Sequence, residues 1–472
     1  MKNHLLVLII SLSTAFTFAQ SLIESYPKTF TSSNDSISIE YSIVKGKKFK
    51  MQLIANDTIS PGTDGGPNIS TKVWIGKDSL SLIHKSFPYA QKTFVSIQTP
   101  KGLAVVALRY NAKSAFFDTT YIQQHQGSIL IEHPEVYELA NIIWALSPSG
   151  ARATDLNTQT EYYKRVKEYF APYGNHPIFQ KLNFADSLYS NNYYDFRENS
   201  YTFCFKGNKI VPHKNYFYVM GDDWDSFTNL FKTLVPLVED FAKQSNFKKF
   251  YNQNKDYYQQ QTDRLKTLLP IQNMWTWLEK EFPDNHYQSY KIVYSPLIGG
   301  SHSTQNYTTF ISMKERFSET VMFICDAEKF DANPNLTEEQ KKGLMSGIVF
   351  TEIDHNYVNP VSNQYKKEIN NVFGNKEEWS KNSSWYSNPM AIFNEYMTHS
   401  VFCLWVKEYF DPITADYVIN AREDLNINKR GFFKFKDFNQ QLLQLRKDNP
   451  ELKVKDLFSK ILGIFMAIGS RQ

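Results

Sequence analysis

Residues 338–359 constrain the fold of this chain more than any other segment, because they are predicted to form one long helix. Thr337 and Gln340 have the spacing of a capping box, in which an N-cap residue and the third helical residue satisfy each other's backbone N–H groups. Apolar residues then recur at helical spacing. Pro360 is expected to end the helix near Asn359, because the residue before a proline is disfavoured in the helical conformation.

One face of this predicted helix is polar. Thr351, Glu352 and His355 lie within four positions of one another and share that face. In the motif His-Glu-x-x-His, two imidazoles on a helix bind zinc and the Glu acts as general base. Glu352 occupies the base position and His355 the second ligand position, while Thr351 stands where the first His would be. A neutral hydroxyl is a poor zinc ligand, so the pattern predicts a fold more strongly than an activity.

A second polar face is predicted downstream, on a helix beginning at Pro389. Glu395 and His399 are four positions apart, and Glu395 follows His355 by forty residues. These two residues are therefore candidate metal ligands. His302, which follows two glycines at 299–300, is a further candidate to replace the lost imidazole, although a loop histidine has the same signature.

The arrangement resembles the gluzincin class of zinc metallopeptidases, in which a Glu on a following helix, often within Asn-Glu, supplies the third ligand. Asn394-Glu395 stands at a suitable remove for that role. The chain also resembles the secreted domain of unknown function 4932 family, from about residue 132 to the helix around Glu395. Segments 134–143, 163–170, 176–177, 295–300 and 356–360 carry this likeness. The resemblance implies Glu352 as base, with His355 and Glu395 as ligands, but it implies no substrate.

The N-terminus has the composition of a secretory signal. Lys2 precedes the apolar run at 5–10, and the small residue Ala19 marks the expected cleavage site. The apolar run is too short to span a membrane, no Cys follows the cleavage region, and no later segment is apolar enough to span. We therefore expect a periplasmic or secreted protein with no lipid anchor. Three widely spaced cysteines at 204, 325 and 403 do not form a disulfide framework, although one bridge is possible.

The length predicts more than one domain within an α+β fold. After the signal at 1–19, residues 20–130 alternate like β-strands and form a predicted β-rich accessory domain. Residues 131–472 form a predicted mainly helical, zincin-like domain. A small antiparallel or mixed sheet is expected in it, with strands near 290–298, 308–313 and 319–325. The net charge of +4 and the lack of a basic block give no reason to expect nucleic acid as a partner.

Three functions are compatible with these residues. In the first, the protein is a zinc-dependent hydrolase of peptides: His355 and Glu395 bind zinc, His399 or His302 replaces the missing imidazole, and Glu352 activates water. Hydrolysis should then be weak, and Thr351→His should raise it. In the second, the metallopeptidase fold is inactive and binds an extracellular peptide or glycan. In the third, Glu352 is itself a ligand in a shell of two Glu and two His that could hold zinc, manganese or iron.

Overall fold

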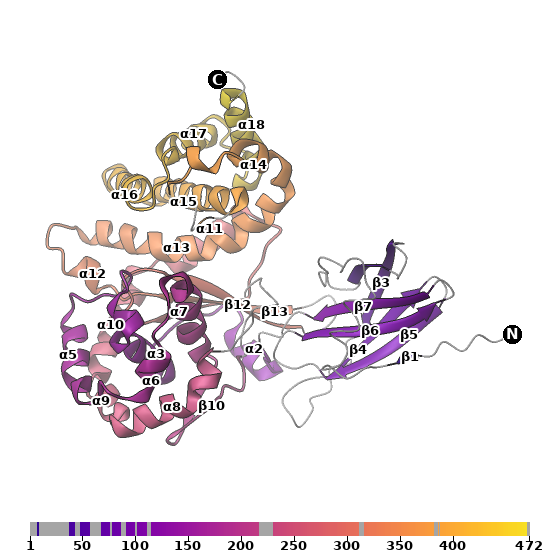
Figure 1. Ribbon diagram of the computed structural model, residues 1–472. Helices are drawn as coiled ribbons and strands as arrows, with labels where there is room; N and C mark the ends of the chain where they lie inside the picture. The colour runs from indigo at the N-terminus through magenta and orange to yellow at the C-terminus, as the bar shows by residue number, and fades with distance from the viewer. Residues whose placement is uncertain are drawn as a thin grey trace. The chain divides into compact units, whose positions relative to one another are not determined.

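The computed structural model describes residues 115–216, 230–310, 316–381, 386 and 388–469, without the side chains of 186–191, 310 and 468–469. Before residue 115 it describes only the backbone of the strands given below. Within these residues the fold is mixed α+β, with many helices and short sheets (Figure 1). The predicted fold class is therefore confirmed. The predicted signal segment lies outside the described residues, apart from Val7–Leu8.

The chain divides into two compact units. The first contains Met1–Gln124, Tyr194–Thr233 and Asn306–Glu319, and the second contains His125–Tyr193, Leu234–Gln305 and Thr320–Gln472. All candidate site residues lie in the second unit, which holds both helices predicted to carry metal ligands. The domain boundaries expected at 19–20 and 130–131 stay predictions.

Two antiparallel sheets follow the alternating apolar pattern of the N-terminal residues. One has the strand order β2-β3-β4-β5 and the other the order β1-β6-β7. Their bounds are β1 Val7–Leu8, β2 Ile37–Ser42, β3 Lys48–Asn56, β4 Asn68–Ile75, β5 Asp78–Lys85, β6 Gln91–Thr99 and β7 Gly102–Tyr110. Strands β6 and β7 pair in antiparallel register from Thr99, opposite Gly102, to Gln91, opposite Tyr110.

A four-stranded sheet has the order β12-β13-β11-β8, and β11 pairs with β8 in parallel, so this sheet is mixed. Its strands are β8 (Ile129–Glu132), β11 (Ser289–Tyr294), β12 (Ser303–Phe310) and β13 (Arg316–Ile324). Strands β11, β12 and β13 correspond to the three strands predicted at 290–325, although β12 begins five residues earlier than expected from 308. Residues 311–315, between β12 and β13, lie outside the described residues. A separate hairpin pairs β9 (Phe203–Lys206) with β10 (Lys209–Pro212).

Helices account for most of the remaining described chain. The first group is α2 Thr119–His125, α3 Glu135–Leu146, α4 Pro148–Ala151, α5 Glu161–Phe170, α6 Pro177–Lys181, α7 Asp186–Ser200, α8 Leu230–Gln244, α9 Phe247–Gln253, α10 Lys255–Leu268 and α11 Ile271–Glu281. The second is α12 Glu328–Asp331, α13 Glu338–Ser362, α14 Lys366–Phe373, α15 Pro389–Tyr409, α16 Pro412–Asp424, α17 Phe435–Asp448 and α18 Phe458–Gly469. Among the described helices, none is both long and apolar enough to cross a membrane.

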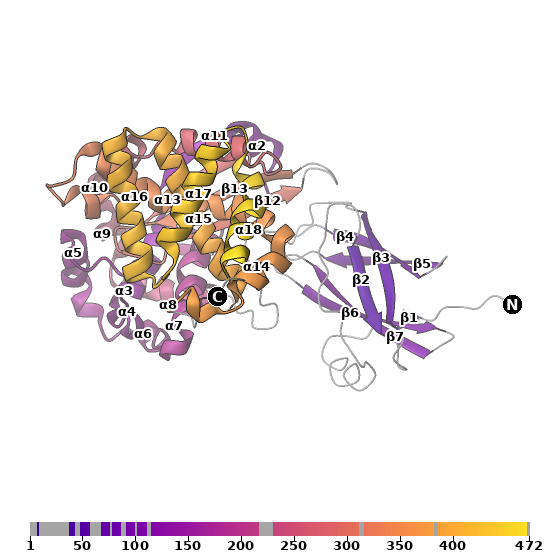
Figure 2. The same cartoon turned by 90° about the horizontal axis from the view of Figure 1, so that it is seen from above.

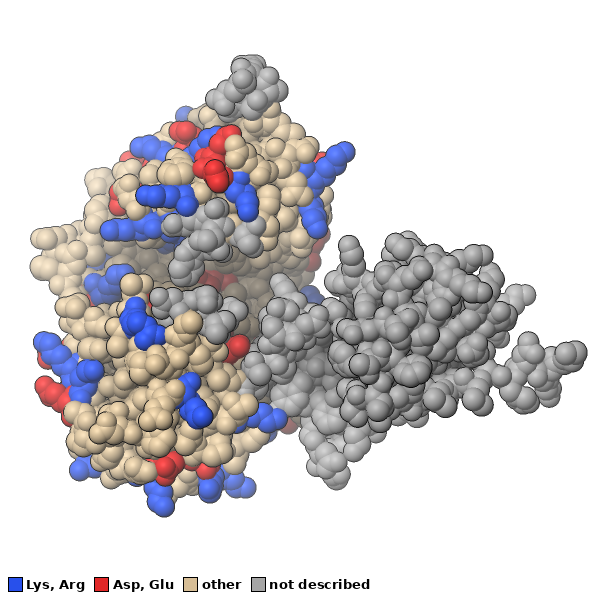
Figure 3. All heavy atoms as spheres, in the orientation of Figure 1, with Lys and Arg blue, Asp and Glu red and all other residues tan. Residues whose placement is uncertain are grey.

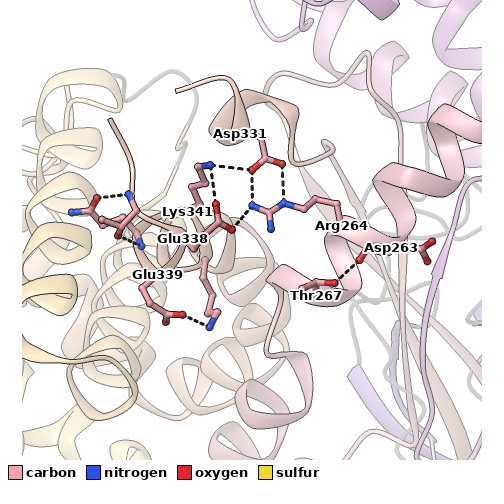
Figure 4. A network of polar contacts seen from close by, with 10 residues as sticks. Asp263, Arg264, Thr267, Asp331, Glu338, Glu339 and Lys341 are labelled. Atoms are coloured by element: carbon pink, nitrogen blue, oxygen red, sulfur yellow. Dashed lines mark hydrogen bonds and ion pairs between the residues drawn. The ribbon is translucent and has the colours of Figure 1, made fainter. Parts of the chain in front are cut away.

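The predicted capping box starts α13 where the sequence places it. The Thr337 side chain accepts from the Gln340 backbone N–H, and the Gln340 side chain accepts from that of Thr337. An ionic network also holds this first turn (Figure 4): Arg264 of α10 donates two hydrogen bonds to Asp331, at 2.9 and 2.6 Å, and one to Glu338 at 2.8 Å. Lys341 lies 2.9 Å from Glu338. The start of α13 is therefore tied to two neighbouring helices.

The prediction that Pro360 ends α13 is wrong, because the helix continues to Ser362 with the proline inside it. A proline in a helix lacks the N–H that would bond the carbonyl four residues earlier. That carbonyl belongs to Asn356, and it accepts instead from the Tyr287 hydroxyl at 3.3 Å. The substitute donor explains why the helix passes through Pro360.

Helices α13, α15 and α16 pack against one another (Figures 1 and 2). Two glycines on α13 permit a close approach of α16. A Cβ atom at Gly343 would meet a Val418 methyl at 2.4 Å, and one at Gly347 would meet the Arg422 guanidinium at 1.7 Å. On the face of the helical part seen in Figure 3, cationic and anionic side chains are interspersed.

Candidate functional site

Helices α13 and α15 bring three of the predicted ligands together. His355 Nε2 lies 3.7 Å from one carboxylate oxygen of Glu395, and His399 Nε2 lies 3.6 Å from the other. Both separations are slightly too long for hydrogen bonds. At such distances the charges of these groups still couple strongly.

Glu395 has a closer cationic partner that the sequence did not single out. The Arg430 guanidinium forms an ion pair with the carboxylate oxygen that faces His399, and it also donates to the Tyr386 hydroxyl at 2.5 Å. Burial raises the pKa of Glu395, but Arg430 and the two histidines outweigh it and hold that pKa well below its usual range. Glu395 is therefore an anion whose charge is balanced within the protein.

Arg430 follows the short π-helical turn η4 (Leu425–Lys429), which continues α16. Gly431, the next residue, has φ of 75°, a conformation that suits glycine. The guanidinium of Arg430 lies over the rings of Tyr386 and Phe432, with centroids 5.8 and 5.4 Å away. About a third of the Arg430 side chain stays exposed, at 30%.

His399 is buried beside a second arginine. Arg422 of α16 lies with Nη1 at 3.3 Å from His399 Nδ1. Burial, followed by the positive charges of Arg430 and Arg422, lowers the pKa of His399 to about 3, although Glu395 acts in the opposite direction. The imidazole is therefore neutral at physiological pH.

His355 is more accessible, with 23% of its side chain exposed. Its Nδ1 atom lies 3.4 Å from the Thr398 hydroxyl, which comes from α15 between Glu395 and His399. A hydrogen bond to one ring nitrogen fixes the orientation of the other. Thr398 is therefore placed to direct the Nε2 atom of His355 toward Glu395.

Thr351 does not present its hydroxyl to the cluster as a donor. It bonds back to its own helix, donating to the carbonyls of Gly347 at 2.8 Å and Ile348 at 3.1 Å. Glu352, the predicted base, is partly exposed, and its charge raises the pKa values of Arg430 and Tyr386. Glu352 thus acts electrostatically on the groups around Glu395.

Asp354 is a buried acid in the same helix that the sequence prediction omitted. Its side chain is fully buried, and no hydrogen-bond partner within the described part of the chain reaches either carboxylate oxygen. Burial raises its pKa well above the usual value, Glu352 and Glu395 add to that effect, and Thr398 and Arg422 oppose it. A neutral carboxylic acid is the form that such surroundings favour.

The structure leaves one predicted replacement ligand unassigned. His302 is partly exposed immediately before β12, and its role stays a prediction.

The main residues that sequence reasoning missed are Arg422 and Arg430. They lie 23 and 35 positions after the side chains they contact, in segments with no motif. Only the packing of α16 against α13 and α15 brings them to the site.

These contacts fit a metal site poorly. Arg430 places a fixed positive charge against Glu395, which would otherwise be the anionic ligand. A cation competes with a divalent ion for the same carboxylate. The donor set is therefore organised around a guanidinium.

No family model matches the chain, and neither the curated proteins nor the solved structures contain a match to it. The likeness to gluzincins and to the domain of unknown function 4932 family stays a prediction from the residues quoted above.

Proposed function

We propose that this protein is a secreted, metallopeptidase-like protein that binds a peptide segment of a protein partner without cleaving it. The observation that carries the proposal is the ion pair between Arg430 and Glu395. In a metallopeptidase-like site, that carboxylate would be a ligand. Here an internal cation neutralises it, and Thr351 stands in place of an imidazole.

The exposed edge of the cluster supports a peptide as ligand. His355, Glu395 and Arg430 each keep part of their side chains accessible, at 23, 16 and 30%. Together they offer an imidazole, a carboxylate and a planar guanidinium with five donors. Backbone carbonyls and amides of a peptide can pair with all three. The flanking Tyr386 ring, which is partly exposed, adds apolar contact area.

A second candidate function, zinc-dependent peptide hydrolysis, is favoured by a different observation. The Nε2 atoms of His355 and His399 face the two oxygens of one carboxylate at 3.7 and 3.6 Å. Two ligands of one tetrahedral zinc ion lie about 3.3 Å apart, given bonds of about 2 Å. With Glu352 nearby as the predicted base, this candidate warrants a direct test against the first.

The test is a peptide library incubated with the mature protein and followed by mass spectrometry. We expect selective retention of some peptides and no new cleavage products, with or without added zinc. Retention should fall in Arg430→Ala, which removes the exposed guanidinium. Lys429→Gln is the matched control, because it removes an exposed charge from the preceding position.

Zinc-dependent cleavage that disappears in Glu352→Gln would instead establish the hydrolase. Equal retention by wild type and Arg430→Ala would show that this site is not where the peptide binds. A glycan array incubated in parallel distinguishes a sugar ligand from a peptide.

A further inference from the structure

Arg422 determines which nitrogen of His399 carries the proton. Its Nη1 atom lies 3.3 Å from His399 Nδ1, and a guanidinium has N–H donors but no acceptor. The Nδ1 atom must therefore present its lone pair. A neutral imidazole has one protonated nitrogen, so the hydrogen is on Nε2.

The Arg422 side chain is firmly placed for this contact. Only 8% of the residue is exposed. One side of the guanidinium lies against Gly347, where any side chain would collide with it, because a Cβ atom there would be 1.7 Å from Nη2. The Phe402 ring is 4.7 Å from the guanidinium carbon. The glycine and the aromatic ring together leave this arginine little freedom to turn away.

The consequence appears at the other ring nitrogen. His399 Nε2, the atom that faces Glu395 at 3.6 Å, carries a hydrogen and no available lone pair. A metal ligand needs that lone pair, since histidine coordinates through an unprotonated nitrogen. In this state His399 can direct a weak N–H toward the carboxylate, but it cannot ligate a metal through Nε2.

We propose that Arg422 and Arg430 together replace a metal ion in this site. Arg430 supplies the positive charge at Glu395, and Arg422 holds His399 in the tautomer whose N–H points to the same carboxylate. The charge of Glu395 is thus balanced within the protein without a metal ion. This inference deepens the proposed function, on which it rests, by identifying what keeps the site in a metal-free form.

The tautomer is tested by NMR of the full mature protein with 15N-labelled histidine. We expect His399 to show the pattern of a neutral ring protonated at Nε2, assigned by its loss in His399→Gln. Arg422→Lys should keep the pattern, because lysine also only donates. Arg422→Met should lose it in favour of a mixture or of the Nδ1–H form. A ring protonated at Nδ1 in the wild type overturns the proposal.

Metal binding is tested by titrating Co²⁺ and Zn²⁺ into wild type, Arg430→Gln and Arg422→Met/Arg430→Gln, with Lys429→Gln as control. We expect affinity for one ion per chain to rise roughly ten- to hundredfold in the double variant, the range seen when groups around a metal ligand are changed. His355→Ala in that background should abolish the gain. Circular dichroism establishes that each variant is folded, and Arg430→Gln alone should show part of the gain if the double variant does not fold.

Equal affinity in wild type and variants, whether tight or absent, overturns the replacement of a metal by the arginines. It leaves the proposed function to be judged separately, because peptide retention without cleavage is measured by a different assay that involves no metal titration. Conversely, failure to retain any peptide removes the proposed function while the tautomer and titration results still stand.

Discussion

At the scale of single residues, the chemistry of the site depends on which cation holds Glu395. The sequence indicates that the imidazole missing from a zinc site is the one at position 351, so that a histidine there would restore the site. The structure adds Arg430, whose charge already occupies the carboxylate. Under the proposed function, a zinc site would require both changes together, because an imidazole at 351 does not remove a guanidinium from Glu395.

We therefore predict that Thr351→His alone yields little zinc binding and little peptide cleavage, whereas Thr351→His/Arg430→Gln yields both. Zinc content after dialysis and cleavage of a peptide library are the measurements. Adding Glu352→Gln should remove the cleavage and keep the metal, since that residue is the predicted base. Strong cleavage by the single variant would show that Arg430 is no obstacle.

Asp326, at the end of β13, provides a residue-scale prediction of pH dependence. Burial raises its pKa to about 7, and Glu328 adds to the shift, while the Tyr257 hydroxyl and the Glu328 amide oppose it. The folded state therefore holds this proton more tightly than the unfolded chain does. The stability that the group contributes is fully present below about pH 4, the ordinary value, and is lost as the pH rises to about 7.

Relative to Asp326→Asn, the free energy of unfolding of the wild type should accordingly fall between pH 4 and pH 7, by at most roughly 1.4 kcal/mol per pH unit. Above about pH 7 the difference should stay constant. Denaturant titrations of both proteins across this range provide the measurement. A difference that is flat or rises with pH would contradict the raised pKa.

At the scale of elements, α13 depends on two tertiary contacts that its own sequence pattern does not indicate. The first is the hydrogen bond from the Tyr287 hydroxyl to the Asn356 carbonyl, to which Pro360 has no N–H to donate. We predict that Tyr287→Phe lowers the free energy of unfolding by about 1 kcal/mol, the usual worth of such a hydrogen bond. In a Pro360→Ala background the loss should shrink, because position 360 then has its own N–H. An equal loss in both backgrounds would mean that the hydroxyl acts elsewhere.

The second contact is the close approach of α16 to Gly343. A methyl group there would meet Val418 at 2.4 Å, so Gly343→Ala should destabilise the protein by about 1–3 kcal/mol, less the gain of about 1 kcal/mol in helix propensity. Val418→Ala should relieve the clash, making the double variant more stable than the sum of the single changes predicts. Chemical denaturation of the four proteins in this cycle gives the coupling energy. No coupling would place the two residues out of contact.

Local patterns predicted the start of α13 and the start of α15 correctly, because helix caps and apolar periodicity involve residues that are close in the sequence. The sequence also singled out His355, Glu395 and His399, since each shares a helical face with another polar residue. Arg422 and Arg430 could not be found in this way. Their roles depend on a tertiary approach that glycine at 347 permits and on the turn η4, and neither has a periodic signature.

At the scale of the whole molecule, stability rests on packed cores and not on covalent bridges. The chain is long enough to bury extensive apolar cores without cross-links. Cys204, Cys325 and Cys403 are free thiols, so the bridge left open by the sequence is not formed. Burial raises the pKa of both Cys325 and Cys403 to about 12 and leaves them unreactive.

We predict that a thiol reagent titrates three cysteines per chain in denaturant and at most Cys204 in the native protein, because only that residue is partly exposed. The thermal midpoint should be the same with and without a reducing agent. This holds even if the protein is exported as its N-terminus predicts, because an oxidising compartment forms a disulfide only between sulfurs that can approach each other. Fewer than three thiols in denaturant, together with a midpoint lowered by reductant, would reveal a bridge and with it a different packing of the segments that carry these residues.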